Sequence, residues 1–160
     1  MKSSSVQAVY AGVPLASRTR VFLQVRLWDE NSTAGDWSEC AVFEIGLLTA
    51  ADWQAQWITG DYTPDPKRRY PVDCFQKHFT TREVKKARLY ATAFGIYQAA
   101  VNGQTVDGFV LAPGVTDYRK RVQYQTYDVT ALLLQGDNTL AFQLADGWYD
   151  AHMDDYSLFP

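Results

Sequence analysis

Long apolar runs and basic clusters are both lacking in this chain of 160 residues. No run approaches the roughly 18 apolar residues that cross a bilayer, and residues 1–15 lack the continuous apolar segment of a secretion signal. These absences predict a soluble chain with no membrane partner and favour the cytoplasm, although they do not decide the compartment. The formal charge of −3 provides no attraction for a phosphate backbone, so nucleic acid is not an expected partner either.

Cysteine and histidine are scarce as well. Cys40 and Cys74 are the only cysteines, and His78 and His152 are the only histidines. Neither cysteine has a second Cys or His at ligand spacing, so a zinc site is not expected, and two buried free thiols are favoured over a disulfide. The chain also lacks the G-x-S-x-G nucleophile elbow and the G-x-x-x-x-G-K phosphate loop. The sequence therefore offers no recognisable catalytic centre of its own.

What the chain does have is the alternation typical of β-strands. Residues 20–28, RVFLQVRLW, alternate with a period of two, which predicts a strand with one buried face. Residues 40–48, CAVFEIGLL, alternate again after a segment rich in turn formers, so the two segments predict antiparallel neighbours joined by a long loop. With a further strand at residues 5–10, only about three strands precede residue 50, fewer than the seven or so of a closed sandwich.

A second β-region follows a boundary or long loop at residues 60–71, which hold three of the six prolines and five charges. Asn102 and Gly103 form the dipeptide that favours a type I′ hairpin turn, so Asn102 is expected to be structural. A short helix is predicted through residues 131–134, and residues 138–149 return to alternation. This region is therefore expected to be mainly antiparallel β.

Two polar and aromatic segments contain the candidate contacts with a carbohydrate, which are Asp117, Tyr118, Arg121, Asp146, Trp148 and Tyr149. Planar aromatic side chains stack on the apolar faces of pyranose rings, and carboxylates and arginines bind the hydroxyl groups. Composition alone favours a plainer alternative, in which Asp117 and Arg121 form a local ion pair beside a turn and Trp148 belongs to the core.

No cofactor is required by these residues, but calcium is a possible ligand near the C-terminus. Four aspartates lie close together in sequence at Asp146, Asp150, Asp154 and Asp155. Oxygen-rich clusters bind calcium, although this spacing lacks the ordered ligands of an EF-hand loop. A catalytic pair among the same carboxylates has no support beyond their proximity in sequence.

Several motifs occur in an order typical of one enzyme family. They are VRLWDENSTAGDWSECAVFEIGLL, DWQAQWI, ARLYATAFGIYQAAVNGQTV and LAPGVTDYRKRVQYQTYDVTALLLQGDNTLAFQLADGWY. Together they resemble the N-terminal, non-catalytic region of bacterial-type α-L-rhamnosidases of glycoside hydrolase family 78. The resemblance implies an all-β chain with a partial fibronectin type III-like sandwich at residues 1–50, a linker at 51–72 and a partial, galactose-binding-like jelly roll at 73–160.

The same resemblance implies a function. Family members cleave terminal α-L-rhamnose with inversion, using an acid and a base on an (α/α)6 barrel that follows these β-domains. The chain is accordingly expected to be an accessory fragment that is inactive alone, with no catalytic residue. Its implied partners are the rest of a rhamnosidase chain and rhamnosides or other plant or bacterial glycans. A stand-alone rhamnose-binding module, with calcium, and a structural docking domain are the alternatives.

Overall fold

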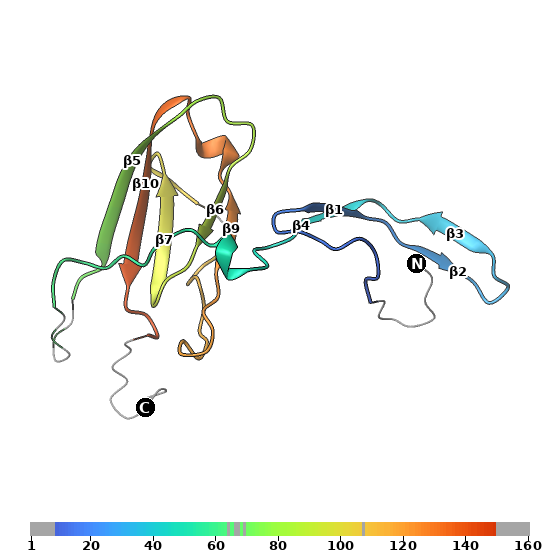
Figure 1. The fold of residues 1–160 in the computed structure, drawn as a ribbon, viewed down its shortest axis with the longest axis horizontal. Coiled ribbons are helices and arrows are strands. Elements are labelled where there is room, and N and C mark those ends of the chain that lie inside the picture. Colours follow the sequence, from blue (N-terminus) through green and yellow to red (C-terminus); the bar gives the residue numbers. More distant parts are fainter. Residues whose placement is uncertain (1–8, 64, 66–67, 69, 107, 150–160) are drawn as a thin grey trace. The chain divides into compact units, whose positions relative to one another are not determined.

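The computed structural model describes residues 9–63, 65, 68, 70–106 and 108–149. The chain divides into two compact units, unit 1 at residues 1–58 and unit 2 at residues 59–160. Its architecture is all-β, as the sequence predicts, with two single turns of 3₁₀ helix among ten strands in the described part (Figure 1). The strand expected at residues 5–10 falls mostly outside the described residues. None of the described helices is long and apolar enough to cross a membrane.

Unit 1 contains two antiparallel ribbons. The first pairs β1 (Arg20–Leu23) with β4 (Ala41–Glu44), which confirms the predicted pairing of these two segments. The second pairs β2 (Arg26–Trp28) with β3 (Ala34–Trp37). The long loop expected between the strands therefore contains a strand of its own.

The single strand predicted at residues 20–28 is broken because Ser38 engages its middle. The Ser38 hydroxyl accepts from the Val25 amide at 2.9 Å, and the Ser38 amide donates to the Val25 carbonyl at 2.8 Å. Beyond this point the Arg26 guanidinium lies over the rings of Trp28 and Trp37, at 4.7 and 4.8 Å from their centroids. Cation–π contacts of this kind stabilise the short β2–β3 ribbon despite its turn-rich sequence.

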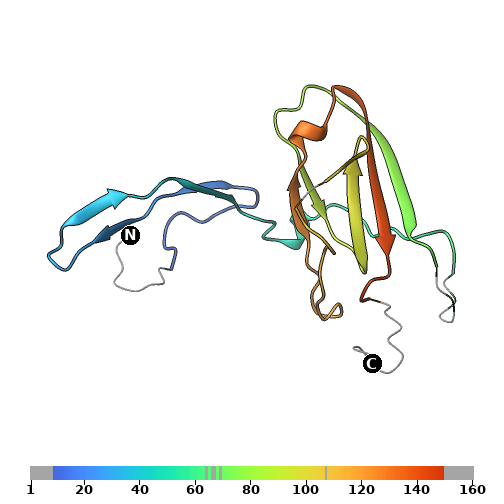
Figure 2. The same cartoon turned by 180° about the vertical axis from the view of Figure 1, so that it is seen from behind.

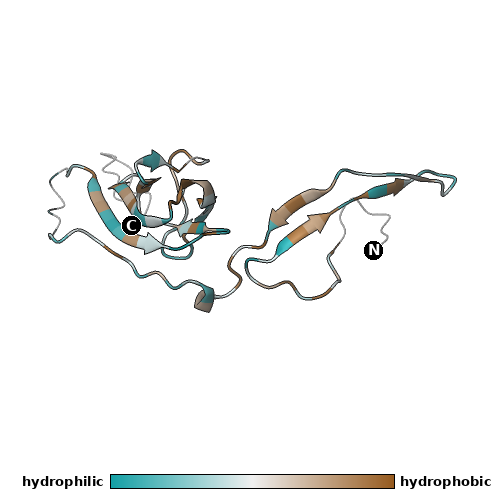
Figure 3. Ribbon diagram, turned by 90° about the horizontal axis from the view of Figure 1, so that it is seen from above, coloured by the Kyte–Doolittle hydropathy of each residue, from teal (hydrophilic) through white to brown (hydrophobic). Residues whose placement is uncertain are grey.

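The prediction that one face of these strands is buried was wrong for the described part of unit 1. Leu27 is 76% exposed and Phe22, on the opposite side of the alternation, is 63% exposed. Figure 3 shows hydrophobic stretches along the strands of this unit. An isolated two-stranded ribbon has no second layer to cover its apolar side chains, whatever its alternation. A 3₁₀ turn, η1 (Ala50–Asp52), ends the unit's regular structure.

Both cysteines are free, as expected, but both are exposed rather than buried. Cys40 immediately precedes β4 in unit 1, where the strands have no covering layer. Cys74 lies on β5 opposite Gln143, among polar side chains on the outer face of its sheet. The expectation failed because alternation alone does not show which of two faces is covered.

Unit 2 has two antiparallel sheets on either side of one core (Figures 1 and 2). The four-stranded sheet has the order β5-β10-β7-β8, and the two-stranded sheet pairs β6 with β9. The bounds of these strands are β5 (Asp73–Thr81), β6 (Arg88–Ala91), β7 (Ile96–Val101), β8 (Gln104–Thr105), β9 (Gln125–Asp128) and β10 (Gly136–Ala145).

The buried core of the described residues lies entirely in unit 2. Alternate residues of β7 point inward, and the inward residues of β9 come from the facing sheet. Several members are alanines, which let the two layers approach closely while a few larger side chains fill the space. The core residues are Ala91, Ala93, Tyr97, Ala99, Val101, Val106, Ala112, Tyr127 and Val129.

The predicted hairpin turn between β7 and β8 is present. Asn102 and Gly103 have φ angles of 52° and 78°, the two positive values that a type I′ turn requires. The Asn102 side chain is structural, as expected: its oxygen accepts from the Thr139 amide at 2.8 Å. Its nitrogen donates to the Leu132 carbonyl and to the Asn138 side chain, both at 2.8 Å.

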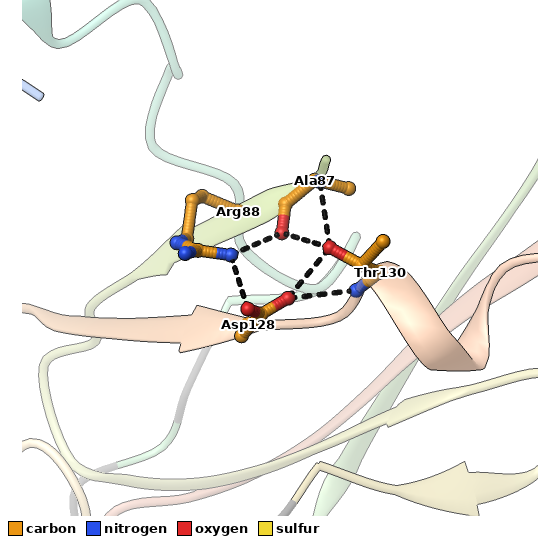
Figure 4. Close-up of polar contacts among 4 residues, drawn as sticks. All are labelled: Ala87, Arg88, Asp128 and Thr130. Carbon is orange, nitrogen blue, oxygen red and sulfur yellow. Dashed lines mark hydrogen bonds and ion pairs between the residues drawn. The ribbon is translucent and has the colours of Figure 1, made fainter. Parts of the chain in front are cut away.

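The helix predicted near residues 131–134 is a single 3₁₀ turn, η2 (Thr130–Leu132), which is tied to β6 (Figure 4). Asp128 accepts from the Thr130 hydroxyl at 2.6 Å and from its amide at 3.1 Å, and forms an ion pair with Arg88 at 2.6 Å. The Thr130 hydroxyl in turn accepts from the Ala87 amide. These hydrogen bonds from Thr130, followed by the charge of Arg88, lower the pKa of Asp128.

Candidate carbohydrate-contact site

The loop between Ala112 and β9, residues 113–124, carries three of the six candidate residues and is anchored at both ends. At its start the Tyr97 amide donates to the Ala112 carbonyl at 2.9 Å. At its end the Thr92 hydroxyl donates to the Gln123 carbonyl at 2.6 Å. These anchors come from β7 and from the segment that follows β6, so both sheets of unit 2 determine where the loop projects.

Asp117 organises the tip of this loop. Its carbonyl accepts from the amides of Lys120 and Arg121, both at 2.9 Å. Its carboxylate forms ion pairs with Lys120 at 3.0 Å and Arg119 at 3.5 Å, and the hydrogen bond with Lys120 is the largest cause of its lowered pKa. The ion pair expected between Asp117 and Arg121 therefore forms with Arg119 and Lys120 instead. Arg121 is held through its backbone, because its carbonyl accepts a hydrogen bond from the Thr116 hydroxyl.

Three rings from distant segments meet beside the loop, and we call Phe94, Tyr118 and Tyr149 the aromatic cluster. Phe94 and Tyr149 stack with centroids 4.9 Å apart and an interplanar angle of 24°. Tyr118 contacts both rings edge-on, at 6.0 Å from Phe94 and 5.4 Å from Tyr149. The Tyr118 hydroxyl donates to the Gly114 carbonyl at 3.3 Å, and partial burial raises its pKa.

A tight turn after β10 brings Tyr149 to this position. The Tyr149 amide donates to the Asp146 carbonyl at 3.1 Å, and Gly147 has a φ of 54°. A side chain at Gly95 would overlap the Ala145 carbonyl oxygen, so only glycine permits this close approach of the end of β10 to the start of β7. The two glycines therefore determine how the aromatic side chains on either side of them meet.

The structure brings together two of the six predicted residues in direct contact, Tyr118 and Tyr149. Asp117 and Arg121 lie on the same loop as Tyr118. Asp146, which is exposed, and Trp148, which is half-buried, lie in the turn that carries Tyr149, which is 52% exposed. The two sequence segments are thus neighbours in space.

Phe94 is the member of the cluster that sequence reasoning missed. It lies in the segment ATAFGIYQAAV, where the alternation of the following strand hides it. The available signal was Gly95, which has a φ of 117° and separates Phe94 from β7. A glycine next to an aromatic residue at the start of a strand indicates a bend that can turn the ring away from the sheet.

No cluster of three or more His, Cys, Asp or Glu side chains suited to a metal ion occurs within the described ranges. Of the four aspartates considered for calcium, Asp150, Asp154 and Asp155 lie outside those ranges. Asp146 is exposed at the end of β10. Calcium binding therefore remains a prediction from the sequence.

Unit 1 and unit 2 each resemble a domain of one class of enzymes, the glycoside hydrolases. Residues 1–49 match the family of Rha78A-like N-terminal immunoglobulin domains. Immunoglobulin domains share their sandwich architecture with the fibronectin type III domains that the motifs indicated. Residues 82–157 match the α-L-rhamnosidase N-terminal domain. The tandem order of these two domains is the one that the sequence motifs indicated.

Individual α-L-rhamnosidases are similar to this chain along nearly its whole length. An α-L-rhamnosidase of Formosa agariphila is 39% identical over 95% of this chain, which covers 18% of that protein. The crystal structure of an Aspergillus terreus α-L-rhamnosidase matches 92% of the chain with a TM-score of 0.82 and 35% identity. A solved structure of the Dictyoglumus thermophilum α-L-rhamnosidase matches 91% of the chain with a TM-score of 0.81 and 33% identity.

The chain therefore belongs with the N-terminal β-domains of α-L-rhamnosidases, which confirms the resemblance seen in its motifs. It spans about a fifth of the length of the relatives it matches, 18% in each of these three comparisons. Within such enzymes it corresponds to an accessory region.

Proposed function

We propose that the chain acts as the N-terminal accessory region of an enzyme that hydrolyses terminal α-L-rhamnose from glycosides with inversion. The observation that carries this proposal is the match of both units to α-L-rhamnosidases over 92–95% of the chain. Residues 1–50 would form a partial fibronectin type III-like sandwich, 51–72 a linker and 73–160 a partial jelly roll. The partners would be the rest of the rhamnosidase chain and its rhamnoside substrates.

The electrostatics of the described carboxylates support a non-catalytic role. An inverting glycosidase needs one carboxylic acid with a raised pKa, so that it can protonate the leaving group, facing a second carboxylate across the substrate. Wherever a shift is resolved among the described aspartates, at Asp52, Asp117 and Asp128, the pKa is lowered by local hydrogen bonds. Such carboxylates stay ionised at neutral pH and are poor proton donors.

The test is a hydrolysis assay with an aryl α-L-rhamnoside. The purified chain should release no aryl alcohol above the buffer rate, while an intact α-L-rhamnosidase, assayed in parallel, turns the substrate over. Saturable turnover that co-purifies with the 160-residue chain would contradict the proposal. The assay should be repeated with added calcium, so that a missing ion cannot account for inactivity.

Carbohydrate binding is a second candidate function, and the aromatic cluster favours it. A partly exposed ring, Tyr149, is held by Phe94 and Tyr118 and flanked by charged groups, which suits a sugar's apolar face and hydroxyls. The proposed contacts are Asp117, Tyr118, Arg121, Asp146, Trp148 and Tyr149.

Isothermal calorimetry with L-rhamnose and rhamnosides, against glucose as the control, tests this second function. Saturable heat with the rhamnose series alone would support it, and loss of that heat with a chelator would implicate calcium. No heat with any of the rhamnose ligands, with and without calcium, would reject it.

A further inference from the structure

One buried side chain, Gln125, ties the loop that carries Tyr118 to the core of unit 2. Gln125 begins β9, faces inward and is 8% exposed. Its Nε2 donates to the Pro113 carbonyl at 3.1 Å, and its Oε1 accepts from the Tyr97 hydroxyl at 3.1 Å. Because a carbonyl oxygen only accepts, the contact with Pro113 must be made by the amide nitrogen, and Oε1 therefore faces Tyr97.

Two buried tyrosines continue this chain of hydrogen bonds. The hydroxyls of Tyr97 and Tyr127 lie 3.0 Å apart, and each has a single hydrogen to donate. With Tyr97 donating to Gln125, Tyr127 donates to Tyr97; the Ala91 carbonyl, at 3.3 Å, is a longer alternative acceptor for Tyr97. Burial first, and then the Tyr127 hydroxyl, raise the pKa of Tyr97, so its proton is retained at neutral pH.

We propose that Gln125 is the positioning residue of the loop at residues 113–124. The Tyr97 hydroxyl and the Pro113 carbonyl hold the amide between them, so the start of the loop is tied to the core, and Tyr118 is thereby held against Phe94 and Tyr149. A preformed surface spares a ligand the cost of ordering the loop. As a statement about ligand binding the inference rests on the proposed carbohydrate role, but as a statement about loop order it stands independently.

The loop contains its own reporter, because trypsin cleaves after Arg119, Lys120 and Arg121, which are exposed at its tip. Gln125→Met keeps a similar volume but removes both hydrogen bonds, which leaves buried polar groups unpaired. In the full 160-residue chain, cleavage at these three sites should accelerate by about tenfold or more. Cleavage at Arg88, within β6, requires unit 2 to unfold, so it should accelerate clearly less than cleavage at the three loop sites.

Two further variants make the test specific. Thr126→Val changes an exposed neighbour on the opposite face of β9 and should leave cleavage in the loop unchanged. Tyr127→Phe removes only the far hydroxyl and should give a smaller acceleration at the same three sites. If Gln125→Met does not fold, Tyr127→Phe decides the question.

Two results would overturn the inference. One is a folded variant with wild-type cleavage at the loop sites, and the other is an equal acceleration at Arg88, which would mean that the residue only stabilises unit 2 as a whole. The assay contains no glycan. Failure of the wild-type chain to bind a rhamnoside would therefore reject the carbohydrate role and leave the loop result in place. Wild-type cleavage of the loop in Gln125→Met would reject the positioning role of Gln125 and leave the carbohydrate role untouched.

Discussion

Phe94 and Tyr149 are 55 positions apart in the sequence, yet their rings stack with centroids 4.9 Å apart. Phe94 lies just before β7, and Tyr149 lies in the turn that follows β10. The contact forms because β7 and β10 are antiparallel neighbours in the sheet. Tyr118 closes the cluster from the loop before β9. An exposed ring held in place by two others loses little conformational freedom when a ligand stacks on it, which is the property expected of a binding surface.

Truncation of Tyr149 should weaken carbohydrate binding more than it weakens the fold. In Tyr149→Ala the stacking partner of a sugar ring is lost, so the Kd for a rhamnoside should rise roughly tenfold. Calorimetry measures the change. Phe22→Ala removes a comparably exposed aromatic side chain from unit 1 and serves as the matched control, with an unchanged Kd. Equal affinities of the wild-type chain and Tyr149→Ala for the rhamnoside would show that the aromatic cluster does not bind the sugar.

Asn138 should be one of the most sensitive positions for the stability of unit 2. It is 2% exposed, and its oxygen accepts from the Leu134 amide at 2.9 Å and from Asn102 at 2.8 Å. Asn138→Ala leaves these donors unpaired, so the free energy of unfolding of unit 2 should fall by about 2–4 kcal/mol. Urea denaturation measures the loss.

Gln143→Ala, on the exposed face of the same strand, is the control for Asn138→Ala and should cost under about 0.5 kcal/mol. Similar losses in the two variants would mean that the hydrogen bonds of Asn138 contribute little.

Acid should destabilise unit 2 in part through Asp128. Thr130 and Arg88 hold its pKa in the folded chain below the unfolded value near 3.9. The ionised carboxylate therefore stabilises the fold above that value, and the contribution is lost as the pH falls through the folded pKa. Asp128→Asn should flatten the decline of stability below about pH 4.

Near neutral pH the effect of Asp128→Asn should be small. Its side chain is 60% exposed, so the cost at pH 7 should stay under about 1 kcal/mol. A double-mutant cycle with Arg88→Met, measured by urea denaturation at pH 7 and pH 3, isolates the ion pair. A coupling energy between Asp128 and Arg88 that is the same at pH 7 and pH 3 would show that ionisation of Asp128 does not cause the loss of stability in acid.

Unit 1 should associate with other molecules or be only partly ordered in the isolated chain. Its described residues contribute nothing to the buried core, and its ribbons leave large apolar side chains such as Leu27 exposed. Exposed apolar surface and unpaired strand edges promote association. Sedimentation should reveal concentration-dependent mass, and Leu27→Glu should reduce it. A monomer at all concentrations with a single cooperative melt would refute this prediction.

Features specified by neighbouring residues could be predicted from the sequence. The Asn102–Gly103 turn follows from two residues that tolerate positive φ, and the β1–β4 pairing follows from two alternating segments. The break at Val25 could not be predicted, because it depends on Ser38 from the opposite side of a hairpin. The exposure of Cys74 and the place of Phe94 likewise depend on which elements pack together, and periodicity does not contain that information.

The candidate site divides in the same way. Tyr118 and Tyr149 could be selected from residue type, since aromatic rings near charged groups suit sugars. Their contact, however, results from the turn at Gly147 and from anchors such as the hydrogen bond from Thr92 to Gln123, which connect distant segments. The pairing of Asp117 with Lys120 rather than Arg121 depends on the backbone turn at the tip of the loop.

The genomic DNA that flanks the reading frame shows whether this chain is an accessory part of a rhamnosidase. Translation of that DNA should reveal, in frame, a barrel domain with acidic residues at its mouth that could serve as the acid and base of an inverting hydrolase. Stop codons directly at both ends of the 160-residue frame would contradict the assignment of this chain to a larger rhamnosidase.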